Sequence, residues 1–223
     1  AHELRNPLSS IKGAAQYLQK EYENEPPIVE FLSIIIDEVN GLSELTTEFL
    51  DFARPIQLEL KPLSLNAVVD KTIQLMRVHI ADSGVALHQR LGEDLPEIEA
   101  DGSQIAQALK NIILNALQAM PDGGELTIET KPSAGRGVEL WIHDTGAGIA
   151  PDKVDRIFVP FFTTKTKGTG LGLSVVRKIV ENHGGRMVVR STQQEGTSFG
   201  VILPLRGATP IIVPEAETVD RKG

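Results

Sequence analysis

The chain of 223 residues carries 22 lysine and arginine residues against 30 aspartate and glutamate residues, which gives a formal net charge of −8. This charge argues against a nucleic-acid partner, and we find no apolar run of about 18 residues or more that could contact or span a membrane. The absence of cysteine excludes disulfides and thiolate metal sites. We expect a soluble, cytoplasmic fragment of one or two domains, with any membrane anchor of the whole protein upstream of it.

Two helices with the apolar spacing of a coiled coil come first in the chain. Apolar residues recur at steps of three and four over residues 4–22, and again over residues 28–52 after a break at 24–27. Two helices bury too little surface on their own, so we expect two chains to pair into a four-helix bundle and form a homodimer. The first helix begins at Ala1 without a cap, which predicts a truncated helix in a piece of a longer protein.

The pattern changes between Arg54 and Pro62, where prolines bracket a short extended stretch at residues 56–60. We therefore predict a dimerisation hairpin over residues 1–54, a second domain over 55–205 and a flexible tail over 206–223. The second domain is expected to contain helices over 66–81, 104–119 and 172–182, and strands over 85–90, 97–100, 126–130, 138–142, 187–190 and 198–203. Strand runs with helices on one face indicate an α+β sandwich.

A histidine stands at the start of the first predicted helix. His2 lies one position off the apolar seam, where its imidazole is expected to be accessible at the bundle surface. A neutral imidazole is a nucleophile, and Glu3 can orient the ring or take its proton. Asn6, one turn further, can hold a water that removes a phosphoryl group from a partner. A histidine beside an acid is far more often a solvated helix residue, so this interpretation depends on the other motifs.

Asp144 ends an apolar strand and is followed by Gly146 and Gly148. This arrangement places a carboxylate at the bottom of a pocket whose wall is bare backbone, and the adenine amino group is a natural donor to it. One alternative is an ordinary strand-ending turn. Another is an aspartic protease, which pairs two Asp-Thr-Gly carboxylates across an all-β fold. The single copy and the many helices argue against the protease.

A glycine-rich segment at residues 168–173 precedes an amphipathic helix, so its amides and the helix N-terminus can meet a polyphosphate. It follows a loop of hydroxyls and cations, a candidate lid in which Lys165 or Lys167 can answer the γ-phosphate charge. Asn111 and Asn115 share a helix face, where their carbonyl oxygens can bind Mg²⁺ carried in by the nucleotide. Taken alone, the loop is equally compatible with an ordinary solvated loop, and a pair of helical asparagines is usually just part of the surface.

Together, six ordered motifs resemble the catalytic core of a two-component sensor histidine kinase, similar to the nitrogen-regulatory sensor branch, over about residues 1–205. Residues 2–7 resemble the H box of that family, 111–120 its N box and 144–148 its G1 box. Residues 158–162 resemble its F box, 168–173 its G2 box and 196–197 its last nucleotide-side motif.

The resemblance implies a signal-transduction transferase: a dimeric bundle joined to an ATP-binding α/β sandwich related to those of gyrase and the Hsp90 chaperone. It implies ATP and Mg²⁺ as cofactors, autophosphorylation of His2 with Glu3 as acid/base helper, and phosphotransfer to an aspartate of a response regulator receiver domain. It also implies a phosphatase activity assisted by Asn6. Residues 54–62 would form a hinge, and the first helix would bend near Pro7.

The resemblance also assigns the nucleotide site. Many members carry a basic residue at the position of Gln118, so we expect Lys165 to take over its phosphate contact. The implied nucleotide-binding residues, of which Asn111 and Asn115 would also hold the metal, are Asn111, Asn115, Asp144, Gly146, Gly148, Ile149, Ile157, Thr163, Thr164, Lys165, Gly170, Leu171, Gly172, Leu173 and Thr197.

Two other classes of function stay open at this point. An ATP-driven clamp or chaperone can use the same nucleotide fold, but it leaves His2, Glu3 and Asn6 without a role. A non-catalytic adapter can bind nucleotide or a receiver domain through the bundle, and the complete set of motifs argues against it.

Overall fold

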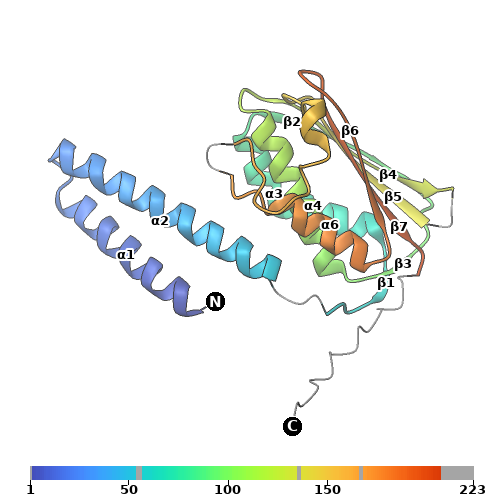
Figure 1. Cartoon of the computed structure of the whole chain (residues 1–223), viewed down its shortest axis with the longest axis horizontal. Helices are drawn as coiled ribbons and strands as arrows, with labels where there is room; N and C mark the ends of the chain where they lie inside the picture. Colours follow the sequence, from blue (N-terminus) through green and yellow to red (C-terminus); the bar gives the residue numbers. More distant parts are fainter. Residues whose placement is uncertain (1, 54–56, 135–136, 166–167, 207–223) are drawn as a thin grey trace, which may run out of the picture.

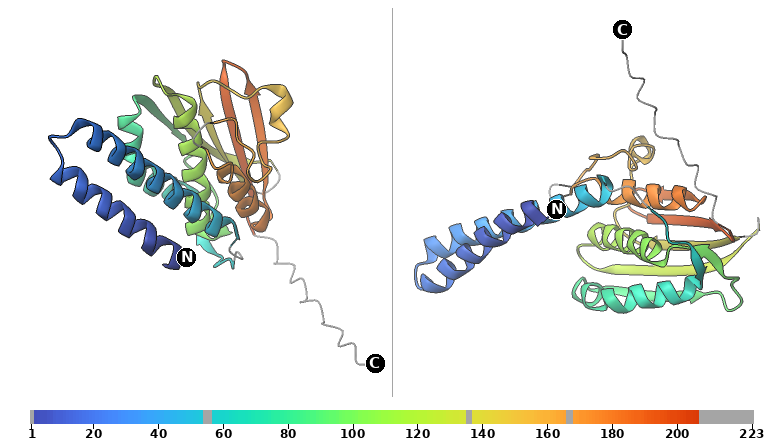
Figure 2. Two further views of the ribbon diagram at one scale, coloured as in Figure 1. Left: turned by 60° about the vertical axis from the view of Figure 1, so that its left-hand side comes forward. Right: turned by 90° about the horizontal axis from the view of Figure 1, so that it is seen from below.

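The computed structural model describes residues 2–53, 57–134, 137–165 and 168–206. A helical hairpin projects from an α/β part. The two parts meet where the second helix of the hairpin ends (Figures 1 and 2). The predicted domain boundary at residues 54–55 and the predicted tail beyond Arg206 lie outside the described residues and stay predictions. In the part of the chain that the structure describes, no helix is long and apolar enough to cross a membrane. The cytoplasmic location also stays a prediction.

The hairpin consists of α1 (His2–Glu21) and α2 (Pro26–Ala53). Proline is tolerated in the first turn of a helix, because the amide it lacks has no intrahelical partner there. Pro26 therefore starts α2. The break between the two helices, predicted at residues 24–27, ends before Pro26. Pro7 lies inside α1, which continues through it. Ala15, Leu32 and Val39 are the buried apolar side chains of this hairpin among the described residues.

The main sheet has five strands in the order β2-β4-β5-β7-β6. Only its β2–β4 pair is parallel, and the other neighbours are antiparallel. The strands are β2 (Val85–Leu91), β4 (Gly124–Ser133), β5 (Gly137–Asp144), β6 (Arg186–Thr192) and β7 (Gly196–Pro204). A separate pair joins β1 (Lys61–Leu63) to β3 (Ile98–Ala100). The predicted strand at 97–100 thus exists, but it pairs with β1.

Three helices pack together on one face of the main sheet: α3 (Leu65–Asp82), α4 (Gly102–Ala119) and α6 (Gly172–Asn182) (Figure 1). Fully buried aliphatic side chains from α4 and the sheet form the centre of the core, among them Ile112, Ile113, Ile128 and Ile142. The predicted α+β architecture with helices on one face is confirmed. The sequence did not predict α5 (Pro151–Val154), which is a single short turn of helix.

The link between the two parts is fastened at one point to the α/β part. The Asp101 carboxylate caps α4 through the amides of Ser103 and Gln104 at 3.0 and 3.2 Å, and it also accepts the amide of Glu59 at 3.1 Å. The buried His183 accepts the Asp101 amide on Nε2 at 3.0 Å. Glu59 is thus held to Asp101, and β1 starts at Lys61. Residues 54–56 of the predicted hinge lie outside the described residues, and the hinge stays a prediction.

The end of α2 contacts the α/β part through Phe52. Its ring meets the ring of Phe161 edge to face, with centroids 6.5 Å apart. The ammonium of Lys178 on α6 donates to the carbonyl oxygen of Phe52 at 2.8 Å. A cation at the C-terminal end of a helix is favourable because the last carbonyls carry partial negative charge.

Candidate functional site

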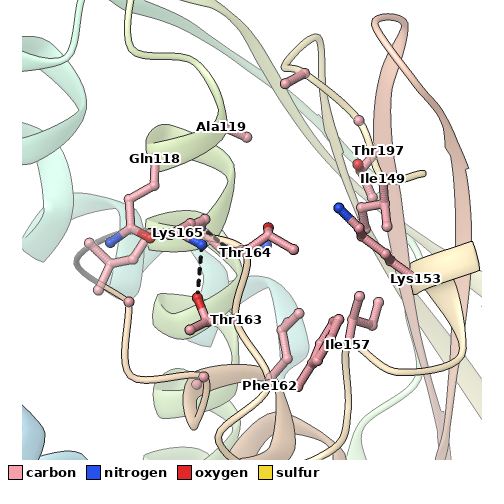
Figure 3. A pocket seen from close by; sticks show the side chains of 18 of the residues that line it. Gln118, Ala119, Ile149, Lys153, Ile157, Phe162, Thr163, Thr164, Lys165 and Thr197 are labelled. Atoms are coloured by element: carbon pink, nitrogen blue, oxygen red, sulfur yellow. Dashed lines mark hydrogen bonds between the residues drawn. The ribbon is translucent and has the colours of Figure 1, made fainter.

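A cavity of about 380 Å³ lies between α4, the segment around α5, the loop that follows it and the glycine-rich segment before α6 (Figure 3). This volume falls within the range usual for small-molecule sites, about 300–1,000 Å³. Thirteen of the fifteen predicted nucleotide-binding residues line it: Asn111, Asn115, Asp144, Gly148, Ile149, Ile157, Thr163, Thr164, Lys165, Gly170, Gly172, Leu173 and Thr197.

Asp144 is the buried carboxylate of this cavity. It ends β5, and its Oδ1 accepts the amides of Gly146 at 3.0 Å and Thr197 at 3.2 Å. No described residue donates to Oδ2, which is available to a donor group inside the cavity. Burial raises the pKa of Asp144, while the two amides and the positive charge of Lys165 act in the opposite direction.

The wall beside Asp144 is backbone in a conformation that favours glycine. Gly148 has φ of +66°, and a Cβ there would collide with the carbonyl oxygen of Thr192. On the preceding residue, the Ala147 amide donates to the Ala119 carbonyl at 3.1 Å, and the Ala147 carbonyl accepts the Gln194 amide at 2.8 Å. The chain is therefore clamped between the end of α4 and the β6–β7 turn, so it lines the cavity with little side chain.

Thr197 is oriented by Ser191, a residue that the sequence analysis did not single out. The Ser191 hydroxyl accepts the Ile149 amide at 2.8 Å and donates to the Gly196 carbonyl at 3.0 Å. The single hydroxyl hydrogen of Ser191 is used in that bond. The Thr197 hydroxyl, whose oxygen lies 2.9 Å from that of Ser191, is therefore the donor between the two. Thr197 therefore has acceptor lone pairs left for the cavity. A serine within a strand gives no sequence signal for this role.

Side-chain amides of α4 form another wall of the cavity. Asn111 donates from Nδ2 to the carbonyl of Gly172 at 3.3 Å, which leaves its Oδ1 unused by that bond. The Lys165 ammonium donates to Asn115 Oδ1 at 2.6 Å and to Gln118 Oε1 at 2.8 Å. Burial lowers the pKa of Lys165, and the charge of Asp144 opposes that shift.

This donor set fits a hard divalent cation that arrives with a phosphate ligand. Mg²⁺ takes oxygen ligands and usually keeps several waters, with few protein groups and the substrate phosphates completing its shell. The residues that the structure describes contain no cluster of three or more histidine, cysteine or acidic side chains suited to a metal. A metal at this place would therefore depend on amide oxygens such as those of Asn111 and Asn115, and on the ligand.

The remaining predicted residues lie elsewhere. Gly146 and Leu171 are not among the lining residues: a Cβ on Gly146 would lie 2.7 Å from the Ala119 carbonyl oxygen, and Leu171 is fully buried. His2 and Glu3 form the start of α1, and nothing about their side chains is described. Asn6 is exposed on α1. All three residues belong to the hairpin, and Asn6 is not among the residues that line the cavity.

Ten lining residues are absent from the predicted list of nucleotide-binding residues. Seven of them fall within the predicted boxes: Leu114, Gln118, Ala119, Ala147, Phe162, Gly168 and Thr169. Sequence reasoning missed the other three altogether, which are Ala150, Lys153 and Gln193. Helical spacing from Asn111 contained the signal for Leu114 and Gln118, since residues three, four and seven apart share a face. Lys153 lies on the wall opposite Lys165, near Ile149 and Thr197 (Figure 3). Its position depends on the short α5, which had no periodic signal.

Comparison with known families decides what kind of protein this is. Residues 1–57 match the His Kinase A (phospho-acceptor) domain. Residues 100–207 match the histidine kinase-, DNA gyrase B- and HSP90-like ATPase family. The solved catalytic domain of histidine kinase ThkA is 32% identical, with 97% of it covered by 66% of this chain at a TM-score of 0.59. The chain belongs to the histidine kinase family.

Longer relatives are similar over both parts of this histidine kinase core. The sensor histidine kinase ZraS of Escherichia coli K12 is 38% identical over 205 residues, 92% of this chain and 44% of that protein. Full-length ShkA in complex with AMPPNP is 28% identical with a TM-score of 0.75, over 93% of this chain and 45% of ShkA. ThkA in complex with response regulator TrrA is 28% identical with a TM-score of 0.70, over 92% of this chain and 59% of that one.

The chain thus spans less than half the length of ZraS. The recognition of a two-component histidine kinase core from six motifs is confirmed, as is the predicted fold. The individual roles of the site residues stay predictions.

Proposed function

We propose that this chain is an ATP-dependent protein-histidine kinase core that phosphorylates its own His2 and passes the phosphoryl group to an aspartate of a response regulator. The observation that carries the proposal is one chain holding both the cavity around Asp144 and a phosphoacceptor-type hairpin that begins at His2. The similarity to a kinase bound to AMPPNP supports ATP, and the similarity to a kinase–regulator complex supports the partner.

The walls of the cavity suggest how ATP lies in it. The Asp144 carboxylate can accept the adenine amino group, and Ile149, Ile157 and Leu173 give the base an apolar surface. The polyphosphate then extends toward the first turn of α6 and Lys165, where backbone amides and an ammonium meet negative charge. Asn111 and Asn115 would hold Mg²⁺, which would offset charge on the phosphates when it is bound.

The transfer step uses the neutral form of His2. A ring nitrogen with a free lone pair forms a bond to the γ-phosphorus while the bond from that phosphorus to the β–γ bridging oxygen breaks, and ADP leaves. The other ring nitrogen then carries a proton that Glu3, the next residue, can take. In the second reaction a regulator aspartate attacks the phosphohistidine, and the imidazole leaves.

In this proposal the acceptor and the donor lie at the same end of the hairpin. Because α1 and α2 run antiparallel, His2 at the start of α1 lies toward the end of α2, which is also where the α/β part is attached (Figure 1). Movement about the link before Glu59 would bring the phosphate to the imidazole. In the structure, the ring of Phe52 at the end of α2 contacts the ring of Phe161 in the α/β part.

We also infer a homodimer. A row of apolar side chains on the hairpin is 38–51% exposed in the single chain: Ile11, Leu18, Ile28, Ile35, Leu42 and Phe49. Their spacing is that of a helix-bundle seam, and a second hairpin would cover them.

The test is incubation with γ-labelled ATP and Mg²⁺. We expect an acid-labile, base-stable label on the parent chain and none on His2→Gln. His79→Gln is the matched control, because His79 is exposed on α3. A label that survives in His2→Gln, or ATP binding without any label on the parent chain, would contradict the proposal and favour an ATP-driven clamp.

A further inference from the structure

The ammonium of Lys165 occupies a place built from two carbonyl oxygens. Lys165 Nζ lies 2.6 Å from Asn115 Oδ1 and 2.8 Å from Gln118 Oε1. An ammonium can only donate, so both amides direct their oxygens, and not their NH₂ groups, at one point. Asn115 and Gln118 are three residues apart on α4 and share a face. Figure 3 shows Lys165 beside Gln118, across the cavity from Lys153.

The same point also suits a divalent cation, since Gln118 adds its oxygen there to that of Asn115, one of the two proposed metal ligands. Two convergent amide oxygens form part of the oxygen shell that Mg²⁺ takes, and phosphates and waters can complete it. An ammonium and a divalent ion repel each other at such short range, so the two cannot share these oxygens. One of them has to leave when the other arrives.

The ammonium of Lys165 is able to move from the amide oxygens to the terminal phosphate. Its four-carbon side chain is flexible, so the ammonium can leave the amides while its backbone stays in place. Lys153, the other described lysine that lines the cavity, is on the opposite wall beside Ile149 and Thr197 (Figure 3). Lys165 is therefore the described lysine next to the α4 amides, where the proposed polyphosphate ends.

We propose that Lys165 is an exchangeable cation of the nucleotide site. It holds the oxygens of Asn115 and Gln118 when no metal is present, yields them to Mg²⁺, and places its charge on the terminal phosphate. This inference rests on the proposed function. Two consequences follow: the preference for ATP over ADP depends on Lys165, and Lys165 raises the concentration of Mg²⁺ that the site requires.

The experiment is calorimetric titration of ATP and ADP into the full chain, first with a chelator and then over a series of Mg²⁺ concentrations. The variant is Lys165→Met. The control is Lys110→Met, which removes the same charge from an exposed position of α4. Thermal unfolding of each variant without nucleotide shows whether it is folded.

We expect Lys165→Met to reduce the ratio of ATP affinity to ADP affinity about tenfold without metal, since a charge-assisted hydrogen bond to the terminal phosphate is lost. The Mg²⁺ concentration that gives half of the gain in ADP affinity should fall, because the competing ammonium is gone. Lys110→Met should change neither quantity. An unchanged ratio and an unchanged Mg²⁺ requirement in Lys165→Met would overturn the inference while leaving ATP binding by the parent chain intact.

A charge swap separates a direct role from a structural one. In Lys165→Gln combined with Gln118→Lys, an ammonium returns from the other side of the 2.8 Å contact. We expect the ATP preference that Lys165→Gln loses to be restored in the double variant. A double variant no better than Lys165→Gln would show that Lys165 acts through the loop structure, which overturns the inference. If the parent chain itself does not bind ATP, the proposed function is wrong, and this result is distinct from a failure of the inference about Lys165.

Discussion

The hairpin and the α/β part bury their apolar side chains in different ways. In the α/β part, Ile112, Ile113 and Ile142 have no exposed surface within a single chain. In the hairpin, Leu42 and Phe49 remain 51% and 45% exposed although they lie on the predicted seam. Apolar surface of this extent is normally covered by a partner. We therefore expect the proposed nucleotide site to be complete in one chain, and we expect a second copy to cover the hairpin.

The two parts also differ in how closely their backbones are constrained. In the cavity wall, Gly148 has a positive φ and no space for a Cβ. In the hairpin, a Cβ on Gly13 or Gly41 would meet no atom within 4 Å. The nucleotide site should therefore be sensitive to small changes, and the hairpin should tolerate them unless they alter its exposed apolar face.

The largest expected effect is on nucleotide binding in Asp144→Ala. We expect ATP affinity to fall about 100-fold, because a buried acceptor of the adenine amino group is lost. Calorimetry measures it, with Asp152→Ala on the exposed side of α5 as the control. The molecular mass of the assembly in solution should stay the same, because the dimerising hairpin is unchanged. Tight ATP binding by Asp144→Ala would show that the pocket assignment is wrong.

A smaller effect is expected for Gly148→Ala. The added Cβ meets the Thr192 carbonyl in a left-handed backbone conformation, so the free energy of unfolding should fall by about 2 kcal/mol. Denaturant unfolding measures this change, and ATP affinity should fall with it. An unaltered stability would mean that the clamp between α4 and the β6–β7 turn is looser than the structure shows.

Asn6→Ala tests the chemistry of the hairpin with the cavity untouched. If Asn6 holds the water that attacks the phosphorylated regulator, regulator dephosphorylation should slow about tenfold while autophosphorylation changes little. Asn24→Ala, at an exposed position between the helices, is the control. Equal losses in both reactions would assign Asn6 a structural role only.

The smallest effect, of opposite sign, is expected in Gly41→Ala. Alanine replaces glycine inside α2 with no atom in its way, so the hairpin should gain about 0.5–1 kcal/mol. Thermal unfolding measures the gain, and ATP affinity should not move. A loss of stability would show that Gly41 is covered in the dimer.

Much of the fold could be predicted because its signals are local. The period of α4 and the position of Asp144, at the end of an apolar strand and before two glycines, needed no partner elsewhere in the chain. The contact of Lys165 with Asn115 and Gln118 could not be predicted, since it joins residues 50 and 47 positions apart. The short α5 and the orientation of Thr197 by Ser191 also depend on tertiary packing.

The most direct test of the contrast between the two parts measures molecular mass and ATP affinity on the same sample. The parent chain should sediment as a dimer of a 24.2 kDa subunit, and Leu42→Glu, which places a charge on the exposed face of α2, should sediment as a monomer. Both should bind ATP with the same affinity, because the cavity lies within one chain. A monomeric parent chain, or a monomeric variant that no longer binds ATP, would contradict the account.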